Sequence, residues 1–409
     1  MPSQILHTLF GEDVIGAMYP AIHSRFGIAA EKALKKIQID YETPFVLGCQ
    51  GPDIFYHSQM TRPVALEYGT LLHRRGYGVF TAMLLKMALP DPPPSKEDIR
   101  MLRREKGISP LGAYALGFMT HAILDRLAHP YIVYKSGLAF PVPAAPPFRD
   151  QVSSLGKAAH AFFERIIDVL MLDALRGRQV SSWDQEALLV SVCEAPPPGL
   201  KELLARALTA AFPERAGGDA KLKERMENTF RDCAAFYRYT DPGKTSIYHR
   251  AHGTESPGWI QEIPLPYLYP ENLPGHIDYL NLAHRTWFYP GPGGKPDSRS
   301  FPDIYAEAVQ SAAEGLSVFI ARYLETGAFP IKEAARAIGN GGLSIQDENG
   351  KPCAPVRTGP LPLDEVLAQQ QRLREKARGC FLPYPQSPLG SGMVKKAKSS
   401  RPRKAKLDP

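Results

Sequence analysis

The chain has 409 residues, of which 44% are hydrophobic and 22% charged, and its formal net charge is +7. This composition predicts a folded protein with a sizeable core, it excludes a small protein that needs disulfide staples, and it does not indicate general disorder. Much of the positive charge lies in one C-terminal run, KKAKSSRPRKAK at 395–406, so the rest of the chain is much closer to neutral.

Helical periodicity predicts an all-α fold. Taken in chain order, the expected helices lie at 11–26, 63–89, 109–136, 151–176, 185–193, 199–212, 219–238, 274–285, 301–326 and 363–378. Proline-rich segments separate several of these helices, and strand-like alternation is scarce. The stretch 240–273 is long, aromatic and poorly periodic, which is typical of a packed functional or interface loop. Beyond residue 343 we expect a short hairpin-like segment, one helix and a disordered basic tail.

The first predicted helix opens with Gly-Glu-Asp at 11–13, and we expect Glu12 and Asp13 to form its acidic first turn rather than to bind a metal. The sequence before it lacks a basic segment followed by a continuous apolar one, and no run of about 18 apolar residues occurs anywhere. We therefore expect a cytoplasmic protein without an export signal or a membrane span. The five cysteines form no C-x-x-C pair, which argues against a disulfide framework and a cysteine zinc site.

The helix predicted at 109–136 carries a polar stripe. His121, Asp125 and His129 lie four residues apart in the apolar stretch GFMTHAILDRLAHPYI, so they share one helical face. A buried carboxylate or imidazole without a partner is costly, and the next residue, Arg126, points about 100° away from Asp125. The stripe therefore requires hydrogen bonds, an ion pair or a metal ion.

Other candidate ligands occur before and after this stripe. Asp53 lies in a Gly-Pro-Asp turn that could hold its carboxylate rigidly, while His160 and Glu164 are four apart and share a helical face. Taken singly, such residues are more often ordinary core or surface residues, and we expect His57 to be a packing residue. Together the candidates form a nitrogen and oxygen donor set suited to zinc: His7, Asp53, His73, His121, Asp125, His129, His160 and Glu164.

In this order the candidates resemble the ligand pattern of the zinc-dependent phospholipase C family, which shares its trinuclear site with single-strand-specific zinc nucleases. The pattern is His, Asp in a G-P-D turn, His, H-x-x-x-D, His and H-x-x-x-E, and the resemblance covers residues 1–180. It implies two or three Zn²⁺ ions. The first would be held by Asp53, His73, His121 and Asp125. The second would be held by His129, His160 and Glu164, and the third by His7 with Asp125 as a bridge.

The resemblance also implies an activity and a domain organisation. It implies a multi-helical catalytic domain at 1–180, followed by a helical region at 181–345 and a short helix with the basic tail at 346–409. The implied activity is hydrolysis of a phosphodiester by zinc-activated water, with Asp53 both binding zinc and accepting a proton. The implied substrate is a phospholipid or another phosphodiester, and a phospholipid substrate would bring the protein into peripheral contact with a membrane surface.

Two other functions stay open at this stage. A nuclease or nucleotidase could use the same metal framework, but it needs aromatic platforms and a basic groove, whereas a lipase needs an apolar rim. A binding module stabilised by zinc would catalyse nothing, and its metal sites would have no open coordination position. The basic tail could bind nucleic acid or anionic lipid, although a solvated terminus is the commoner role of such a run.

Overall fold

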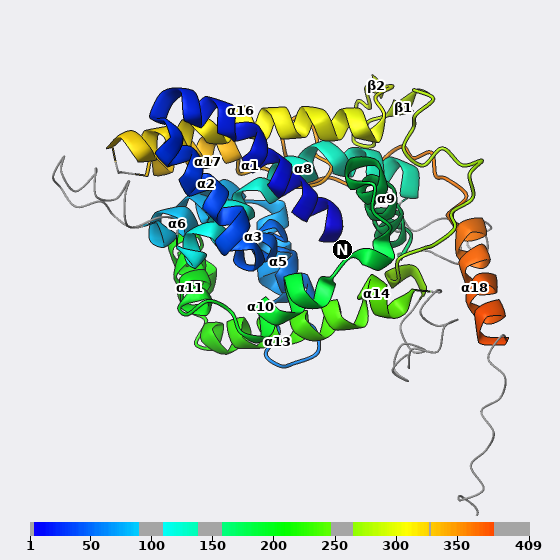
Figure 1. The fold of residues 1–409 in the computed structure, drawn as a ribbon, viewed down its shortest axis with the longest axis horizontal. Helices are drawn as coiled ribbons and strands as arrows, with labels where there is room; N and C mark the ends of the chain where they lie inside the picture. The colour runs from blue at the N-terminus through cyan, green and yellow to red at the C-terminus, as the bar shows by residue number, and fades with distance from the viewer. Residues whose placement is uncertain (1–3, 90–108, 138–157, 247–264, 327–328, 380–409) are drawn as a thin grey trace, which may run out of the picture.

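The computed structural model describes residues 4–89, 109–137, 158–246, 265–326 and 329–379 (Figure 1). Most of these residues are helical, and the one sheet among them is the antiparallel pair β1 (Trp287–Phe288) and β2 (Pro296–Asp297). The predicted all-α fold is therefore confirmed. Within the described ranges, no helix is both long enough and apolar enough to cross a membrane.

The helices of the described residues range from single turns to α8, which has 27 residues. The first half comprises α1 (Gln4–Phe26), α2 (Ile28–Asp40), α3 (Glu42–Cys49), α4 (Asp53–His57), α5 (Leu66–Arg74), α6 (Tyr77–Ala88), α8 (Pro110–Ser136) and α9 (Ala159–Arg176). The second half comprises η3 (Val180–Ser182), η4 (Glu186–Val190), α10 (Ser191–Glu194), α11 (Leu200–Ala211), α12 (Pro213–Ala216), α13 (Leu222–Tyr239), α14 (Pro242–Thr245), η6 (Leu265–Tyr267), α16 (Phe301–Thr326), α17 (Ile331–Ile338) and α18 (Leu363–Gly379).

Two predicted helices are not single helices in the structure. The segment 63–89 forms two helices, α5 and α6, because the chain turns at Gly76, whose φ of 72° is left-handed. The predicted helix at 274–285 is wrong. That segment is a series of turns in which Asn281 and His284 also have positive φ, and the Asn281 side chain donates to the carbonyl of Arg285.

Helix α1 begins at Gln4 rather than at residue 11, so Glu12 and Asp13 lie in its interior and not in a first turn. Its start is fixed from a distance, because the carboxylate of Asp168 on α9 accepts from the backbone N–H groups of Ile5 (3.2 Å) and Leu6 (2.8 Å). A side chain far along the sequence thus satisfies N–H groups that a local capping residue usually satisfies.

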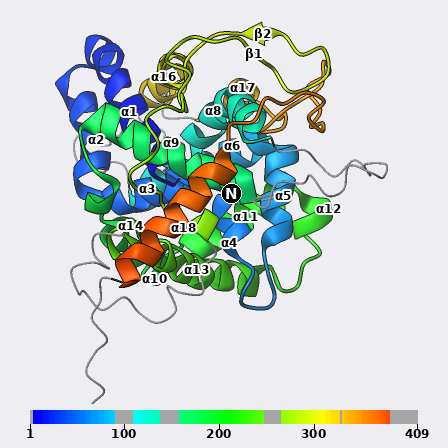
Figure 2. The same cartoon turned by 90° about the vertical axis from the view of Figure 1, so that its right-hand side faces the viewer.

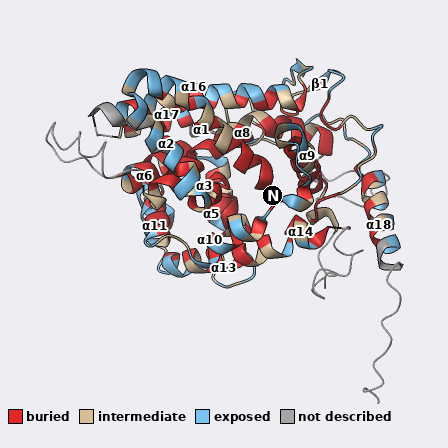
Figure 3. Ribbon diagram, in the orientation of Figure 1, coloured by how far each residue is buried: buried red, intermediate tan, exposed pale blue. Residues whose placement is uncertain are grey.

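Helix α8 runs through the middle of the molecule, and most of its residues are buried (Figure 3). It crosses α3 at very short range, where Gly48 on α3 and Gly117 on α8 allow the two backbones to touch. A Cβ atom on Gly48 would overlap the carbonyl group of Tyr114, and one on Gly117 would overlap the carbonyl oxygen of Phe45. This contact fixes the polar stripe of α8 against the turn that follows α3.

One hydrophobic core extends through the molecule and draws residues from both sides of residue 180, from Leu6 to Val366. Helix α1 packs against α16, and α6 packs against α11 and α17 (Figure 1). Helix α4 packs against α13. Helix α18 lies on the outside of the bundle, where Gln370 binds the backbone of Glu271 (Figure 2). The three predicted domains stay a prediction.

Other predictions concern the end of the chain and the long loop. The hairpin-like segment after residue 343 is confirmed by a bridge between Gln346 and Pro352, and α18 confirms the last predicted helix. The basic tail lies outside the described residues, as do 151–157 and the central part of the aromatic stretch 240–273.

Candidate metal centre

The eight predicted ligand residues lie together, although they come from five helices. Helix α1 supplies His7, α4 supplies Asp53 and α5 supplies His73. Helix α8 supplies the polar stripe, and α9 supplies His160 and Glu164. Three groups of donor atoms are close enough to hold a metal ion: His7, His121 and Asp125; Asp53, His73 and His121; and His129, His160 and Glu164. All eight are buried except His73 and His160, which are partly exposed.

Asp125 is the centre of this arrangement, and its two carboxylate oxygens face different histidines. Oδ1 lies 3.2 Å from His7 Nε2 and 3.7 Å from His129 Nε2. Oδ2 lies 3.1 Å from His121 Nε2 and 3.9 Å from His73 Nε2. A carboxylate with separate partners for each oxygen has the geometry required to bridge two cations.

The Gly-Pro-Asp turn brings Asp53 to the same histidines. Asp53 Oδ1 lies 3.0 Å from His73 Nε2, and Oδ2 lies 3.5 Å from His121 Nε2. The turn passes so close to His121 that a Cβ atom on Gly51 would overlap the imidazole ring, and Gly51 also has a positive φ of 55°. Glycine at this position therefore allows the Asp53 carboxylate to approach the stripe.

The third group forms where α8 faces α9. Glu164 Oε1 lies 3.0 Å from His160 Nε2 and 3.4 Å from His129 Nε2. Because His129 also lies near Asp125, this group is connected to the other two through the stripe.

Backbone carbonyls orient three of the five imidazoles. His73 Nδ1 lies 2.8 Å from the carbonyl oxygen of Gly69, His121 Nδ1 lies 3.1 Å from that of Cys49, and His129 Nδ1 lies 2.9 Å from that of Leu343. A carbonyl can only accept, so Nδ1 carries a proton in each ring, and Nε2 is the nitrogen left to coordinate a cation between the rings and the carboxylates. This is the arrangement by which proteins orient histidine ligands of metal ions.

The donor atoms at the centre do not satisfy one another by hydrogen bonding. Asp53 Oδ2, His121 Nε2 and Asp125 Oδ2 are buried and take part in no hydrogen bond, although they lie within 3.5 Å of at least one of the others. Buried polar atoms in folded proteins nearly always have a partner. A divalent cation coordinated by these atoms would provide one, so the residues fit a metal centre.

The carboxylates of the centre are ionised. Burial alone would raise the pKa of Asp125, but the charges of His121 and His129 hold it well below its usual value. Burial likewise opposes ionisation of Asp53, and the charges of His121 and His73 lower its pKa. The pKa of Glu164 is also lowered against the effect of burial, chiefly by His160. The centre therefore carries the negative charge that cations require.

A segment far along the chain contacts two of the candidate ligand residues through its backbone. Residues 339–343, which we call the clasp, follow α17; Leu343 accepts from His129 through its carbonyl oxygen and donates its N–H to the carbonyl of His73 (2.9 Å). Arg126 holds the clasp by donating to carbonyl oxygens at the end of α17 and in the clasp itself: Ile338, Gly339, Gly341 and Gly342. Sequence reasoning did not find the clasp, because a carbonyl acceptor can be any residue type.

His57, which lies one turn after Asp53, is a packing residue as predicted. Its ring stacks on that of Phe236, with 3.9 Å between the centroids, and neither ring nitrogen has a hydrogen-bond partner. Burial lowers the pKa of His57 to about 3.

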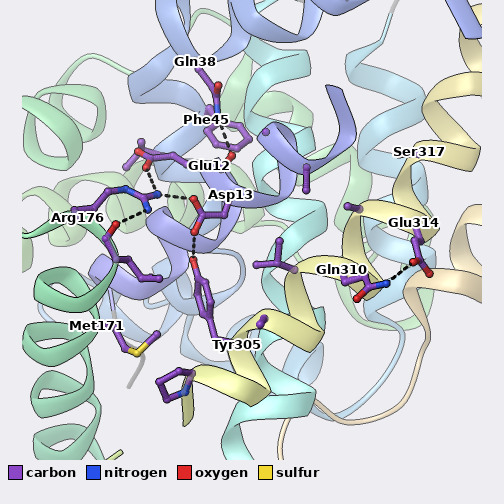
Figure 4. A pocket seen from close by; sticks show the side chains of 18 of the residues that line it. Glu12, Asp13, Gln38, Phe45, Met171, Arg176, Tyr305, Gln310, Glu314 and Ser317 are labelled. Carbon is purple, nitrogen blue, oxygen red and sulfur yellow. Dashed lines mark hydrogen bonds and ion pairs between the residues drawn. The ribbon is translucent and has the colours of Figure 1, made fainter. Parts of the chain in front are cut away.

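Glu12 and Asp13 are not part of the centre. Both contact Arg176 at the end of α9, at 3.2 Å and 2.6 Å, and Asp13 also accepts from the hydroxyl of Tyr305 at 2.8 Å (Figure 4). They line a separate pocket of about 1170 Å³ between α1, α9 and α16, and none of the eight candidate ligands lines it.

No family model, curated protein or solved structure matches the chain. The assignment of the centre therefore depends on the residues and their geometry.

Proposed function

We propose that the chain is a zinc-dependent phosphodiester hydrolase of the phospholipase C type. The observation that carries the proposal is that the eight candidate ligands form three groups of nitrogen and oxygen donors, and that four of their histidines face the two oxygens of Asp125. The resemblance in ligand order stated above supports the same function, and phospholipid is the first substrate class to test.

The number and type of donors support zinc and catalysis. Each of the three groups offers three donor atoms, whereas structural zinc sites are usually closed by four protein ligands. Imidazole nitrogens combined with carboxylate oxygens suit zinc better than copper(I) or iron–sulfur clusters. Zinc ions held there would supply a water of lowered pKa and neutralise charge on the phosphoryl oxygens.

The protein's own residues would orient these parts. Asp125 contacts histidines of all three groups and so holds them at a fixed separation. Asp53 is ionised, and its Oδ2 accepts no hydrogen bond within the structure, so this oxygen can hold a proton released during the reaction.

Metal analysis followed by a phosphodiester screen tests the proposal. We expect two or three zinc ions per chain after expression with added zinc, and hydrolysis of phosphatidylcholine or bis-p-nitrophenyl phosphate that chelator abolishes. His160→Gln should bind less zinc than the wild type and lose hydrolysis. The control is His284→Gln, which changes an exposed histidine outside the centre and should keep the zinc content and the activity of the wild type. Less than about one zinc per chain would contradict the proposal.

The same screen separates the other functions. Chelator-sensitive cleavage of single-stranded DNA without phospholipid hydrolysis would identify a nuclease. Two or three bound zinc ions without hydrolysis of any phosphodiester would identify a zinc-stabilised binding module.

A further inference from the structure

The pocket that Glu12 and Asp13 line lies apart from the metal centre and has no part in the proposed hydrolysis. Its volume of about 1170 Å³ is somewhat above the range of about 300–1,000 Å³ that is usual for small-molecule sites. The residues that line it come from five helices: α1, α2, α3, α9 and α16. The pocket is therefore large enough for an organic ligand and is built by the tertiary fold.

Short side chains on two packed helices make room for the pocket. Helix α1 contributes Gly16, Ala17 and Ala21, and α16, which packs against α1, contributes Ala306 among others. The lining positions of α16 occur between residues 302 and 317 at alternating steps of three and one, so they share one helical face. At about 1.5 Å per residue they extend over about 22 Å, which makes the pocket elongated.

Most of the wall is apolar. Larger apolar side chains from α3, α9 and α16 complete it: Phe45, Val46, Met171, Leu175 and Val309. A wall of this kind binds the apolar part of a ligand by removing it from water.

The charged groups at the pocket are unbalanced. Four carboxylates line it, those of Glu12, Asp13, Glu42 and Glu314, whereas Arg176 is the one cation among the described residues that line it. Figure 4 shows the carboxylates of Glu12 and Asp13 directed at Arg176, with Glu314 further along α16. The pocket therefore carries a surplus of negative charge.

The hydrogen-bond donors near Glu12 are already engaged. Arg176 is shared between Glu12 Oε2 (3.2 Å) and Asp13 Oδ1 (2.6 Å), and the Tyr305 hydroxyl donates to Asp13 Oδ2 (2.8 Å). The side-chain amide of Gln38 donates to the backbone carbonyl of Glu12 (3.0 Å). Both oxygens of Asp13 thus have partners, but one oxygen of Glu12 can still accept a hydrogen bond.

The electrostatic environment of Glu12 favours a further cation. Burial raises the pKa of Glu12, the contact with Arg176 lowers it, and the charges of Asp13 and Glu42 raise it. Carboxylates this close repel one another, and a second positive charge would relieve the repulsion.

We propose that this pocket binds a long-chain amine, with the ammonium group at Glu12 and the apolar chain along α16. An ammonium group brings the N–H donors and the positive charge that the pocket lacks, and its bond to a carboxylate is charge-assisted. The elongated apolar wall matches a chain and not a compact body. The inference is independent of the proposed hydrolysis, because none of the eight candidate metal ligands lines the pocket.

Calorimetric titration of the full chain with decylamine, decanol and decanoate tests the choice of ligand. The three probes share one chain and differ in the charge of the head group. We expect decylamine to bind, decanol to bind about 10-fold more weakly or less, and decanoate to bind weakest, because it adds a negative charge to an acidic pocket.

Glu12→Gln tests the position of the ammonium group. It should weaken the binding of decylamine by about 10-fold and leave that of decanol unchanged, because only the charge-assisted bond is lost. The control is Glu227→Gln, which removes a surface carboxylate paired with Lys201 outside the pocket and should bind decylamine as the wild type does.

Gly16→Leu tests the position of the chain. A Cβ atom on Gly16 meets nothing within 4 Å, so a leucine side chain there has room to enter the pocket and should weaken decylamine binding by about 10-fold or more. Gly315→Leu on α16 is the matched control, because a Cβ atom there also meets nothing within 4 Å and Gly315 does not line the pocket. Both variants should stay folded and keep the zinc content of the wild type, since leucine favours a helix more than glycine does.

Three results would overturn the proposal. The first is a wild-type protein that does not bind decylamine at millimolar concentration. The second is decanol or decanoate bound as tightly as decylamine, because the pocket would then not select a cation. The third is wild-type affinity for decylamine in Gly16→Leu, because the amine would then bind elsewhere. These results decide the matter even if Glu12→Gln does not fold.

Discussion

Asp125 contacts four histidines through two oxygens, so its negative charge is shared by all three donor groups. Asp125→Asn keeps the shape of the side chain and one oxygen, but it removes the charge that offsets the cations. We expect the variant to lose at least one zinc ion per chain and to lose hydrolysis, as measured by metal analysis and by assay.

The matched control is Asp232→Asn, which changes a buried aspartate that binds Met60 and Thr61 away from the centre. It should lower the thermal midpoint and leave the zinc content unchanged. If Asp125 belonged only to a hydrogen-bond network, Asp125→Asn would behave like this control, with a cost of about 1–3 kcal/mol and no change in zinc.

His57 gives the protein a predictable acid sensitivity. Its pKa of about 3 in the folded state lies below the value near 6.5 of an unfolded histidine, so the unfolded state takes up a proton first as the pH falls. His57 therefore does not lower the free energy of unfolding above pH ~6.5, and it lowers this free energy progressively as the pH falls from there towards ~3. Replacement by phenylalanine keeps the stacking on Phe236 and removes the proton site.

When the pH falls from 7 to 5, the free energy of unfolding of the wild type should decrease more than that of His57→Phe. We expect the difference, measured by urea unfolding, to be on the order of 2 kcal/mol. His284→Phe, at an exposed position, should follow the wild type. Parallel stability curves for His57→Phe and the wild type would contradict the low pKa.

The spacing of four identified the stripe and the pair His160 and Glu164, and the order of the whole set added the three remaining candidates: His7, Asp53 and His73. The groups that orient them were not predictable. His73, His121 and His129 are oriented by backbone carbonyls of Gly69, Cys49 and Leu343, and every residue has such a carbonyl.

At the scale of single helices, the contact between α3 and α8 sets the position of the stripe relative to Asp53. Gly117→Ala would place a methyl group against the carbonyl oxygen of Phe45 and force the two helices apart. We expect a loss of about 1–3 kcal/mol of stability together with weaker zinc binding, measured by thermal unfolding and by competition with a chelator. Gly16→Ala on α1 is the control, because a Cβ atom there meets nothing within 4 Å, and alanine favours a helix. Equal stability of the two variants would show that α3 and α8 can separate without cost.

The clasp is tested by Arg126→Gln. The variant keeps the eight ligands but releases the carbonyls of the clasp, so the imidazole of His129 loses its fixed orientation. We expect zinc affinity to fall by about 10–100-fold with the helical content preserved, as measured by chelator competition and circular dichroism. Arg238→Gln, which breaks surface ion pairs with Glu186 and Glu194, should keep wild-type zinc affinity. If Arg126→Gln binds zinc with wild-type affinity, the clasp does not contribute to zinc binding.

Helical periodicity found most of the longer helices, but it missed α2, α3 and α17, although α2 and α17 each have one buried and one exposed face. Helix α3 was missed because six of its eight residues are buried, so that its sequence shows no alternation of faces. The predicted helix at 274–285 failed for the opposite reason. Its apolar spacing is helical, but Asn281 and His284 adopt left-handed conformations that end a helix.

At the scale of the whole molecule, the ligands lie in the first 164 residues but the core does not end there. Leu6 and Val366 belong to one hydrophobic cluster, and α6 packs against α11 and α17. We expect a fragment of residues 1–180 to show no cooperative thermal unfolding and to aggregate, because its apolar faces lose their partners. Residues 1–379, which keep every described helix, are the control and should melt like the full chain. A cooperative transition in the 1–180 fragment would establish it as an independent domain.

The clasp also has a consequence for biosynthesis. A ribosome makes the chain from its N-terminus, so all eight ligands are translated long before Leu343, whose carbonyl fixes His129 and whose N–H fixes the end of α5. A nascent chain therefore carries the metal ligands without the segment that orients them. We expect such a chain to bind zinc weakly and reversibly, and to retain it only once residues 339–343 have been translated and the clasp has docked on His129 and α5.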